Sequence, residues 1–190
     1  MNDTDVLKEL EETGALLNGH FELRSGLHSN RFFQCANVLR YPRIAGRLCE
    51  ELVTRCKAEL DFGVLDGVIS PALGGILVGH EVARVLDTQC VFAEKQEGKL
   101  VMRRFTLRPG QRYVVAEDVI TRGGRVQETI DIVKAAGADV AAVLVLVDRS
   151  AGQARFDFPT FSLLQMAPEV WVPAACPLCA RNEPFVHPGS

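Results

Sequence analysis

The sequence predicts an α/β fold with a central, mainly parallel sheet and helices on both faces. Two observations lead to this prediction. Short apolar segments alternate with helical segments over residues 64–150, which is the order expected of β-α-β units. One of these segments, residues 139–150, is apolar almost throughout, and such a strand is typical of a sheet that is covered on both faces.

Length and composition fit one globular domain, residues 1–190. Of its 190 residues, 47% are hydrophobic and 24% are charged, and the formal net charge is −3. A chain of this size can bury a full hydrophobic core. The slightly acidic charge disfavours a nucleic-acid partner. The longest apolar run, residues 140–147, is too short for a membrane helix of about 20 residues. The sequence MNDTDVLKEL resembles no targeting signal, so we expect a cytoplasmic protein with reduced thiols and no membrane partner.

The first elements follow from apolar spacing and from turn residues. Residues 4–18 carry apolar side chains at helical spacing, and Gly19 is the expected end of that helix. Residues 20–38 predict a β-hairpin. Residues 43–58 predict a second helix, with Pro42 in its first turn.

The remaining segments give the alternating pattern. In chain order they are a strand over 64–70, a glycine-rich turn at 71–75, a helix over 76–86, two β segments within 90–106, a strand over 112–118, a helix over 126–137 and the strand over 139–150. The tail is rich in Pro and Cys and has no clear period. We therefore expect residues 60–150 to form the core, and residues 1–40 and 160–190 to form a small hood over the strand ends.

The strongest chemical signal is the segment VVAEDVITRGGR, residues 114–125. An apolar strand delivers Glu117 and Asp118 to its carboxyl end, where ligands bind in open α/β sheets. A glycine-containing turn that opens a helix offers unpaired N–H groups to a phosphate, and adjacent carboxylates can accept hydrogen bonds from a vicinal diol or help to hold a metal. The segment therefore predicts a sugar-phosphate site. The alternative is a strand that ends in a solvated acidic turn with a glycine hinge.

This segment resembles the phosphoribosyl-pyrophosphate (PRPP) motif of the type I phosphoribosyltransferases. Further segments resemble one branch, the orotate phosphoribosyltransferases. They are the N-terminal hairpin HFELRSGLHSNRFFQCANVL, the pyrophosphate loop SPALGGILVG, the short flap FAEKQEGKLVMRRF of a bacterial subgroup, and the ending CPLC…PGS. The resemblance spans nearly the whole chain.

The resemblance implies a pentosyl transfer in pyrimidine (UMP) biosynthesis. Orotate and PRPP, with Mg²⁺, would give orotidine 5′-monophosphate and pyrophosphate. The implied Mg²⁺ is held mainly by PRPP, with no metal site made by protein side chains alone.

The resemblance also implies roles for individual residues in binding PRPP. Glu117 and Asp118 would contact the ribose hydroxyls, with Asp118 also counted as catalytic. The residues expected around the 5′-phosphate are Thr121, Arg122, Gly123, Gly124 and Arg125. Those expected around pyrophosphate are Ala72, Leu73, Gly74 and Gly75, where the family often has a non-proline cis peptide bond. Two departures from the family pattern are Leu73–Gly74, in place of an aromatic residue and a lysine, and the extra charges of Arg122 and Arg125.

The orotate-binding residues implied by the resemblance are Arg149, Arg24, Phe33 and Thr121. Arg149 follows the apolar strand, and a planar guanidinium suits bidentate binding of the orotate carboxylate. The alternative for Arg149 is a solvated arginine at a strand end. Phe32 and Phe33 point to opposite faces of a strand, so one of the two belongs to the core.

The flap, residues 94–105, is expected to carry cations across a homodimer into the neighbouring site. Lys95 and Lys99 are the candidate catalytic lysines, with Arg103 and Arg104 nearby. Taken alone, this charged turn is more typical of a solvated loop than of a functional flap.

Cys176 and Cys179 form a lone C-x-x-C pair. Zinc needs four ligands, and His187 is the only further candidate in the tail, so we expect a structural tail rather than a metal site. His20 and His28 are expected to be structural histidines.

Two other functions stay open. A purine-base phosphoribosyltransferase would need a different base pocket after the apolar strand, where Arg149 favours a carboxylated base. A non-catalytic regulator that senses PRPP on the same fold would add a nucleic-acid surface, for which an acidic chain offers no obvious candidate.

Overall fold

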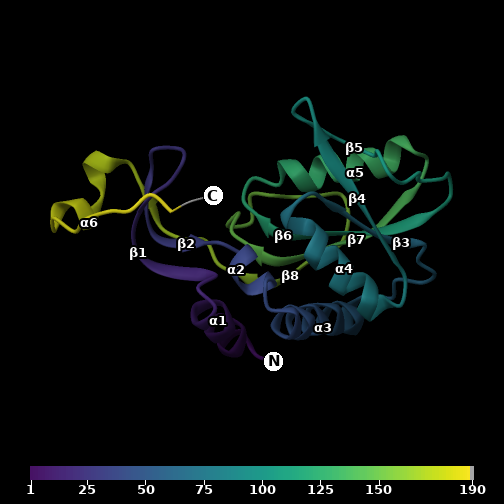
Figure 1. Ribbon diagram of the computed structural model, residues 1–190, viewed down its shortest axis with the longest axis horizontal. Helices are drawn as coiled ribbons and strands as arrows, with labels where there is room; N and C mark the ends of the chain where they lie inside the picture. The colour runs from purple at the N-terminus through teal and green to yellow at the C-terminus, as the bar shows by residue number, and fades with distance from the viewer. Residues whose placement is uncertain (189–190) are drawn as a thin grey trace.

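A computed structural model describes residues 1–188, so the last two residues of the predicted domain, 189 and 190, lie outside the described residues. Its main sheet has the strand order β5-β4-β3-β6-β7-β8 (Figure 1). Neighbouring strands are parallel throughout, except that β5 is antiparallel to β4. The strands are β3 (Gly67–Pro71), β4 (Gln89–Gln96), β5 (Lys99–Val101), β6 (Arg112–Ile120), β7 (Asp139–Asp148) and β8 (Thr160–Gln165).

Helices cover both faces of this sheet, as the sequence predicts. On one face, α3 (Pro42–Glu59) and α4 (Gly74–Leu86) pack their apolar stripes into the larger hydrophobic cluster. On the other face, α5 (Gly124–Ala135) packs into a second cluster. Pro42 occupies the first turn of α3, where its missing N–H costs no helical hydrogen bond.

Strand β7 explains why its sequence is apolar throughout. Leu144 and Leu146 point into the cluster under α3 and α4, whereas Val143 and Val145 point into the cluster under α5. Alternate side chains of a strand point to opposite faces, so a strand covered on both sides needs apolar residues at every position.

A separate three-stranded sheet forms the hood, which stands beside the main sheet and is joined to it through α2 (Ala36–Leu39) (Figure 1). It contains β1 (Leu16–Glu22), β2 (His28–Phe33) and β9 (Val170–Trp171), all antiparallel to their neighbours. The tail completes the hood with a short 3-10 turn at Pro173–Ala175 and with α6 (Pro177–Ala180).

The predicted boundaries at the N-terminus are wrong by several residues. Helix α1 spans Asp3–Glu12 and does not reach residue 18. Gly14 adopts a positive φ of 70°, which ends the helix, and the next apolar residues begin β1. Gly19 therefore lies inside a strand and does not end a helix. The predicted second strand of the hairpin stops at Phe33, and the following residues turn into α2.

The prediction that residues 160–190 belong to the hood is wrong for β8. This strand pairs in parallel with β7 and forms the edge of the main sheet. Only Leu163 and Leu164 of its six residues are buried, so its sequence has no recognisable apolar run.

No helix within residues 1–188 is both long and apolar enough to span a bilayer. The cytoplasmic location stays a prediction.

Candidate active site

The carboxyl ends of β3 and β6 open into a cavity of about 610 Å³. The loop after β3 forms one wall, and the loop between β6 and α5 forms another. Strand β7 ends beside them, because the Arg149 N–H donates to the carbonyl of Ile120 at 2.8 Å. Parallel strands place their carboxyl ends on one edge of the sheet, and this edge is where α/β folds bind ligands.

Glu117 and Asp118 stand together at the floor of this cavity. The Glu117 side chain is only 5% exposed, and its Oε1 accepts the Asp118 N–H at 3.1 Å. Burial, reinforced by the charge of Asp118, raises the pKa of Glu117 well above its usual range. Burial also raises the pKa of Asp118. Two adjacent, poorly solvated carboxyls would be stabilised by hydrogen bonds from donors such as ribose hydroxyls.

The loop after β3 contacts this acid pair through glycine backbone. A Cβ added to Gly74 would lie 2.5 Å from Asp118 Oδ2, and a Cβ added to Gly75 would lie 2.9 Å from Glu117 Oε1. Any side chain at these positions would therefore displace a carboxylate. The peptide bond between Ala72 and Leu73 is cis, as the resemblance implies.

The loop between β6 and α5 has the form of a phosphate cradle. Gly123 adopts φ of 78° as the residue before α5, and a Cβ there would meet Phe156 at 2.9 Å. The first N–H groups of α5 have no helical partners, and they lie where the helix dipole favours an anion. Arg125 closes the cradle because its Nη1 donates to the carbonyl of Ala72 at 3.1 Å.

Arg149 lies half-buried beside the cavity without an acidic partner among residues 1–188. Its guanidinium lies 5.3 Å from the centre of the Phe33 ring, and its buried Nε has no hydrogen-bond partner. Burial lowers the pKa of this guanidinium. A half-buried cation with an unpaired donor is suited to an anionic ligand.

The structure brings most of the predicted PRPP-binding residues to the cavity wall. Those that line it are Ala72, Leu73, Gly74, Glu117, Asp118, Thr121, Gly123, Gly124 and Arg125. Gly75 lies just behind the wall, against Glu117. Arg122 is exposed in the loop between β6 and α5.

The predicted orotate residues other than Thr121 are not part of that wall. Phe33 is 6% exposed and belongs to the hydrophobic core, where it supports the Arg149 guanidinium. Arg24 lies exposed in the turn between β1 and β2. Phe32, on the opposite side of the strand, packs near Phe21 in the hood at a ring separation of 6.0 Å.

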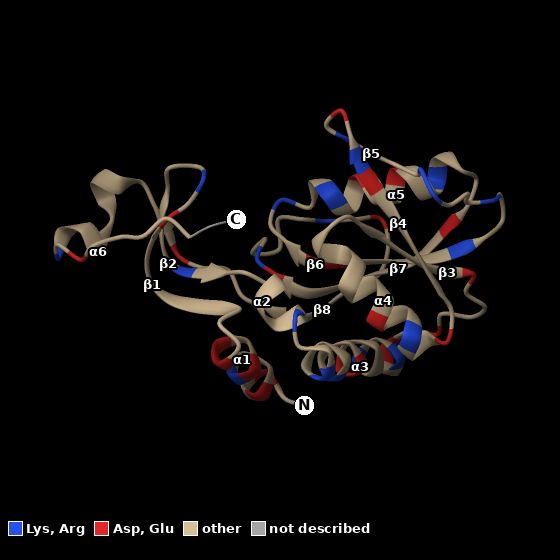
Figure 2. Ribbon diagram, in the orientation of Figure 1, with Lys and Arg blue, Asp and Glu red and all other residues tan. Residues whose placement is uncertain are grey.

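Lys95 and Lys99 also lie away from the cavity of their own chain. Both are exposed on the β4–β5 hairpin, which projects beyond the sheet and carries charges of both signs near its tip (Figure 2). The hairpin is tied to α5 close to its turn, where the Leu100 N–H donates to Glu128 at 2.6 Å.

Sequence reasoning missed several residues of the cavity wall, of which Gln34 and Ala36 are the clearest. They follow directly after β2, and the only signal for them was their position at the end of the hairpin. Between them, Cys35 lies buried with its Sγ 3.8 Å from the Asp118 carbonyl. Burial, with the charge of Asp118, raises the pKa of this thiol and keeps it protonated.

The comparison with family models identifies a phosphoribosyl transferase domain over residues 42–178. Among curated proteins, the orotate phosphoribosyltransferase of Desulforamulus reducens is 48% identical, covering 100% of this chain and 98% of its own. That of Heliobacterium modesticaldum is 47% identical, covering 100% of this chain and 99% of its own.

A solved structure above 25% identity bears the same name. The orotate phosphoribosyltransferase of Aeropyrum pernix superposes with a TM-score of 0.66 at 26% identity, over 84% of this chain and 93% of that one. The family-model match covers most of the chain, and the curated relatives match it from end to end. The segment that resembles the PRPP motif lines the cavity described above. The chain therefore belongs to the orotate phosphoribosyltransferases, a branch of the phosphoribosyltransferase family.

Proposed function

We propose that this protein transfers the phosphoribosyl group of PRPP to orotate, giving orotidine 5′-monophosphate and pyrophosphate in pyrimidine synthesis. The observation that carries the choice of base is Arg149, a half-buried guanidinium beside the cavity with no carboxylate partner among the described residues. A base that carries a carboxylate supplies that partner, whereas a purine base does not. The curated relatives bear the name of the same activity.

In the proposed reaction, a ring nitrogen of orotate loses its proton to water or to the pyrophosphate and forms a bond to the anomeric carbon, as the bond from that carbon to pyrophosphate breaks. The electron pair of the broken bond leaves with pyrophosphate. Glu117 and Asp118 would hold the ribose through its hydroxyls, and the amides at the start of α5 would hold the 5′-phosphate. The loop at 72–75 would receive the leaving pyrophosphate through its backbone. The protein's contribution is to position both reactants and to exclude water.

The residues at the cavity fit a magnesium ion that is held mainly by substrate. Mg²⁺ keeps several waters and binds through one or two carboxylates together with substrate phosphates. The cavity offers that number of carboxylates, from Glu117 and Asp118. When bound, Mg²⁺ would neutralise charge on the pyrophosphate.

The proposed activity is tested by the loss of orotate absorbance when the purified protein is mixed with orotate, PRPP and Mg²⁺. We expect turnover that needs all three components and stops when EDTA removes the metal. The matched assay replaces orotate by adenine, which should not react. Turnover with adenine but not with orotate would contradict the proposal, and PRPP binding without turnover on either base would indicate a regulator.

We also propose that the active unit is a homodimer in which the β4–β5 hairpin of one subunit supplies Lys95 and Lys99 to the cavity of the other. Support comes from the position of both lysines, which are exposed on a projecting hairpin and absent from the wall of their own cavity. Cations near the leaving pyrophosphate would stabilise its developing charge.

Mixing two inactive variants tests this arrangement. The first variant is Lys95→Ala/Lys99→Ala and the second is Arg149→Ala. If each site takes its lysines from the partner, half of the reassorted dimers contain one intact site, so the mixture should recover about a quarter of the wild-type activity. The matched control mixes Arg149→Ala with Asp118→Asn, which lie in the same subunit's cavity and should recover nothing. A lysine–arginine mixture no more active than its components would contradict the shared site.

A further inference from the structure

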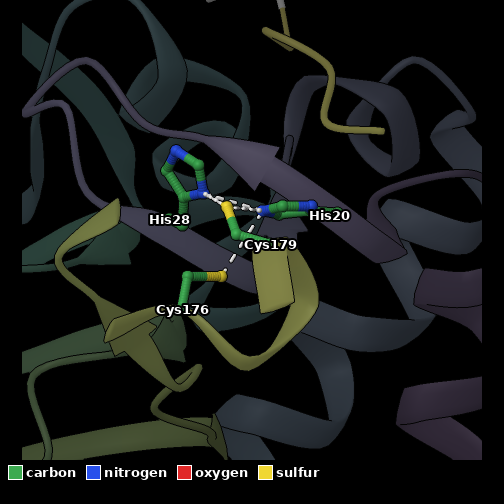
Figure 3. A group of neighbouring side chains, drawn as sticks. All are labelled: His20, His28, Cys176 and Cys179. Carbon is green, nitrogen blue, oxygen red and sulfur yellow. Dashed lines mark hydrogen bonds between the residues drawn. The ribbon is translucent and has the colours of Figure 1, made fainter. Parts of the chain in front are cut away.

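We propose that His20, His28, Cys176 and Cys179 form a structural zinc site that holds the hood together. These four side chains come from β1, from β2 and from the tail around α6, and they point toward one another (Figure 3). One ligand atom from each lies within 4.8 Å of all the others. None of the four lines the active-site cavity, and the proposed reaction does not use them.

The spacing of the ligand atoms matches a tetrahedral zinc ion. Zinc binds sulfur at about 2.3 Å and imidazole nitrogen at about 2.0–2.1 Å, which sets sulfur and nitrogen ligands about 3.5 Å apart and two nitrogens about 3.3 Å apart. The Cys176 Sγ and the Cys179 Sγ lie 3.5 Å and 3.8 Å from His20 Nε2. The Cys179 Sγ lies 3.2 Å from His28 Nδ1. The two nitrogens are hydrogen-bonded at 2.7 Å, so the rings would separate by about 0.6 Å around the ion.

The surroundings of the histidines favour metal binding. The Nδ1 of His20 lies 2.8 Å from the carbonyl of Glu183, so it donates its proton there and leaves the Nε2 lone pair directed into the cluster. On the far side of His28, its Nε2 faces Glu22 Oε2 at 3.9 Å. Histidine ligands of zinc commonly give their second ring nitrogen to a backbone carbonyl or a carboxylate, which fixes the ring and its tautomer.

The hood also buries few large hydrophobic side chains of its own. Beyond the residues next to the main sheet, Phe21 and Leu178 are its buried large hydrophobic side chains, and neither belongs to the two hydrophobic clusters of the described chain. Of its other large apolar side chains, Leu23, Leu27, Phe32 and Trp171 are half-buried, and Leu17, Val170, Val172, Phe185 and Val186 are exposed. By contrast, His20 and His28 are 5% and 2% exposed. A small subdomain that buries polar ligands in place of a core is typically stabilised by a metal or by disulfides.

The donor set identifies the metal and the kind of site. Two thiolates with two imidazoles in tetrahedral arrangement are characteristic of zinc, whereas Mg²⁺ and Ca²⁺ require oxygen ligands. Four protein ligands leave no open position for water or substrate, as is usual in structural zinc sites. The expectation that Cys176 and Cys179 form a tail without a metal considered only ligands close in sequence. The missing two ligands lie about 150 residues away, across the hairpin of the hood.

The decisive measurement is the zinc content of the untagged protein, purified without chelators. We expect one zinc per chain, and less than about a tenth of that in the double variant Cys176→Ser/Cys179→Ser. Cobalt substituted for zinc should give the visible absorption of a tetrahedral Co²⁺ with thiolate ligands. The matched controls are Cys90→Ala and His187→Ala, which lie outside the cluster and should keep both the metal and the spectrum.

Hydrogen exchange provides a second readout that does not depend on activity. Removal of the metal by a strong chelator should speed exchange in the hood, residues 16–33, and leave β6 and β7 protected. Protein without zinc that carries a Cys176–Cys179 disulfide would overturn the proposal. Equal zinc content in the double variant and in the wild type would also overturn it, because the metal would then lie elsewhere.

Discussion

Replacing Arg149 by alanine is expected to lower kcat/KM for orotate by roughly a hundred- to a thousand-fold, with little change in the affinity for PRPP. The size of the effect follows from the loss of a partly desolvated charge pair, which typically costs 2–5 kcal/mol when one partner is truncated. The affinity for PRPP should stay unchanged, because the predicted contacts to PRPP come from the loops at 72–75 and 121–125 and not from Arg149. Steady-state kinetics with each substrate varied in turn would separate the two effects.

The stability of the Arg149→Ala protein provides the control for folding. In the free protein this guanidinium has a buried nitrogen without a hydrogen-bond partner, and its centre lies 5.3 Å from the centre of the Phe33 ring. Its removal should therefore leave the melting temperature unchanged or slightly raised, because an unpaired buried charge is destabilising. Arg149→Lys should restore little, since lysine lacks the bidentate fork. Arg155→Ala, an exposed arginine a few residues further along, should keep full activity. Equal losses of activity in Arg149→Ala and Arg155→Ala would contradict the proposed carboxylate site.

The sequence predicted the core of this protein well because the core depends on local periodicity. The apolar strand at 139–150, the helix stripe at 43–58 and the order of strand, acidic pair and glycine turn all appear within single segments. The edge strand β8 was missed because only Leu163 and Leu164 of its six residues are buried, which is too few for an apolar run or a regular alternation. The end of α1 was missed because the apolar spacing continues past Gly14, where the backbone changes direction.

The parts of the site that could not be predicted depend on contacts between distant segments. Nothing in the sequence shows that the glycine backbone at 74–75 presses against the two carboxyls after β6. The sequence also cannot show that Arg149 has no acidic partner among the described residues, because this depends on where the fold places every Asp and Glu side chain. The four ligands of the proposed zinc site divide between residues 20–28 and 176–179, and a search along the chain finds only half of them.

The second prediction concerns the acid pair Glu117 and Asp118, where we expect one substitution to change activity and stability in opposite directions. Replacing Glu117 by glutamine should lower kcat/KM for PRPP by about ten- to a hundred-fold. Ribose hydroxyls and a magnesium ion carried by PRPP would favour the ionised carboxylate in the complex, and a hydrogen bond to a charged group is worth about 1.5–3 kcal/mol. The same change should stabilise the free protein at neutral and alkaline pH. The reason is that burial, reinforced by Asp118, makes a charge at position 117 unfavourable in the folded state.

The direction of the pH effect follows from the raised pKa of Glu117. Below about 4.5, its value in the unfolded chain, both states carry the proton and Glu117 costs the fold nothing. Above that value the unfolded chain releases the proton while the folded protein retains it, so the free energy of unfolding falls as pH rises toward the folded pKa. Glutamine carries no such proton. The Glu117→Gln variant should therefore melt close to the wild type near about pH 5 and roughly 3–10 °C above it near about pH 8.

Thermal melts of the free protein at the two pH values would measure this difference, with Glu12→Gln as the matched control on the surface of α1. The control should melt with the wild type at both values. A Glu117→Gln protein that loses both stability and activity at pH 8 would show that the carboxylate serves the fold. If stability rises where activity falls, the pair costs the free protein stability and is retained for the ligand, because ribose hydroxyls and a magnesium ion carried by PRPP would add donors and positive charge to those of Arg125 and the α5 amides.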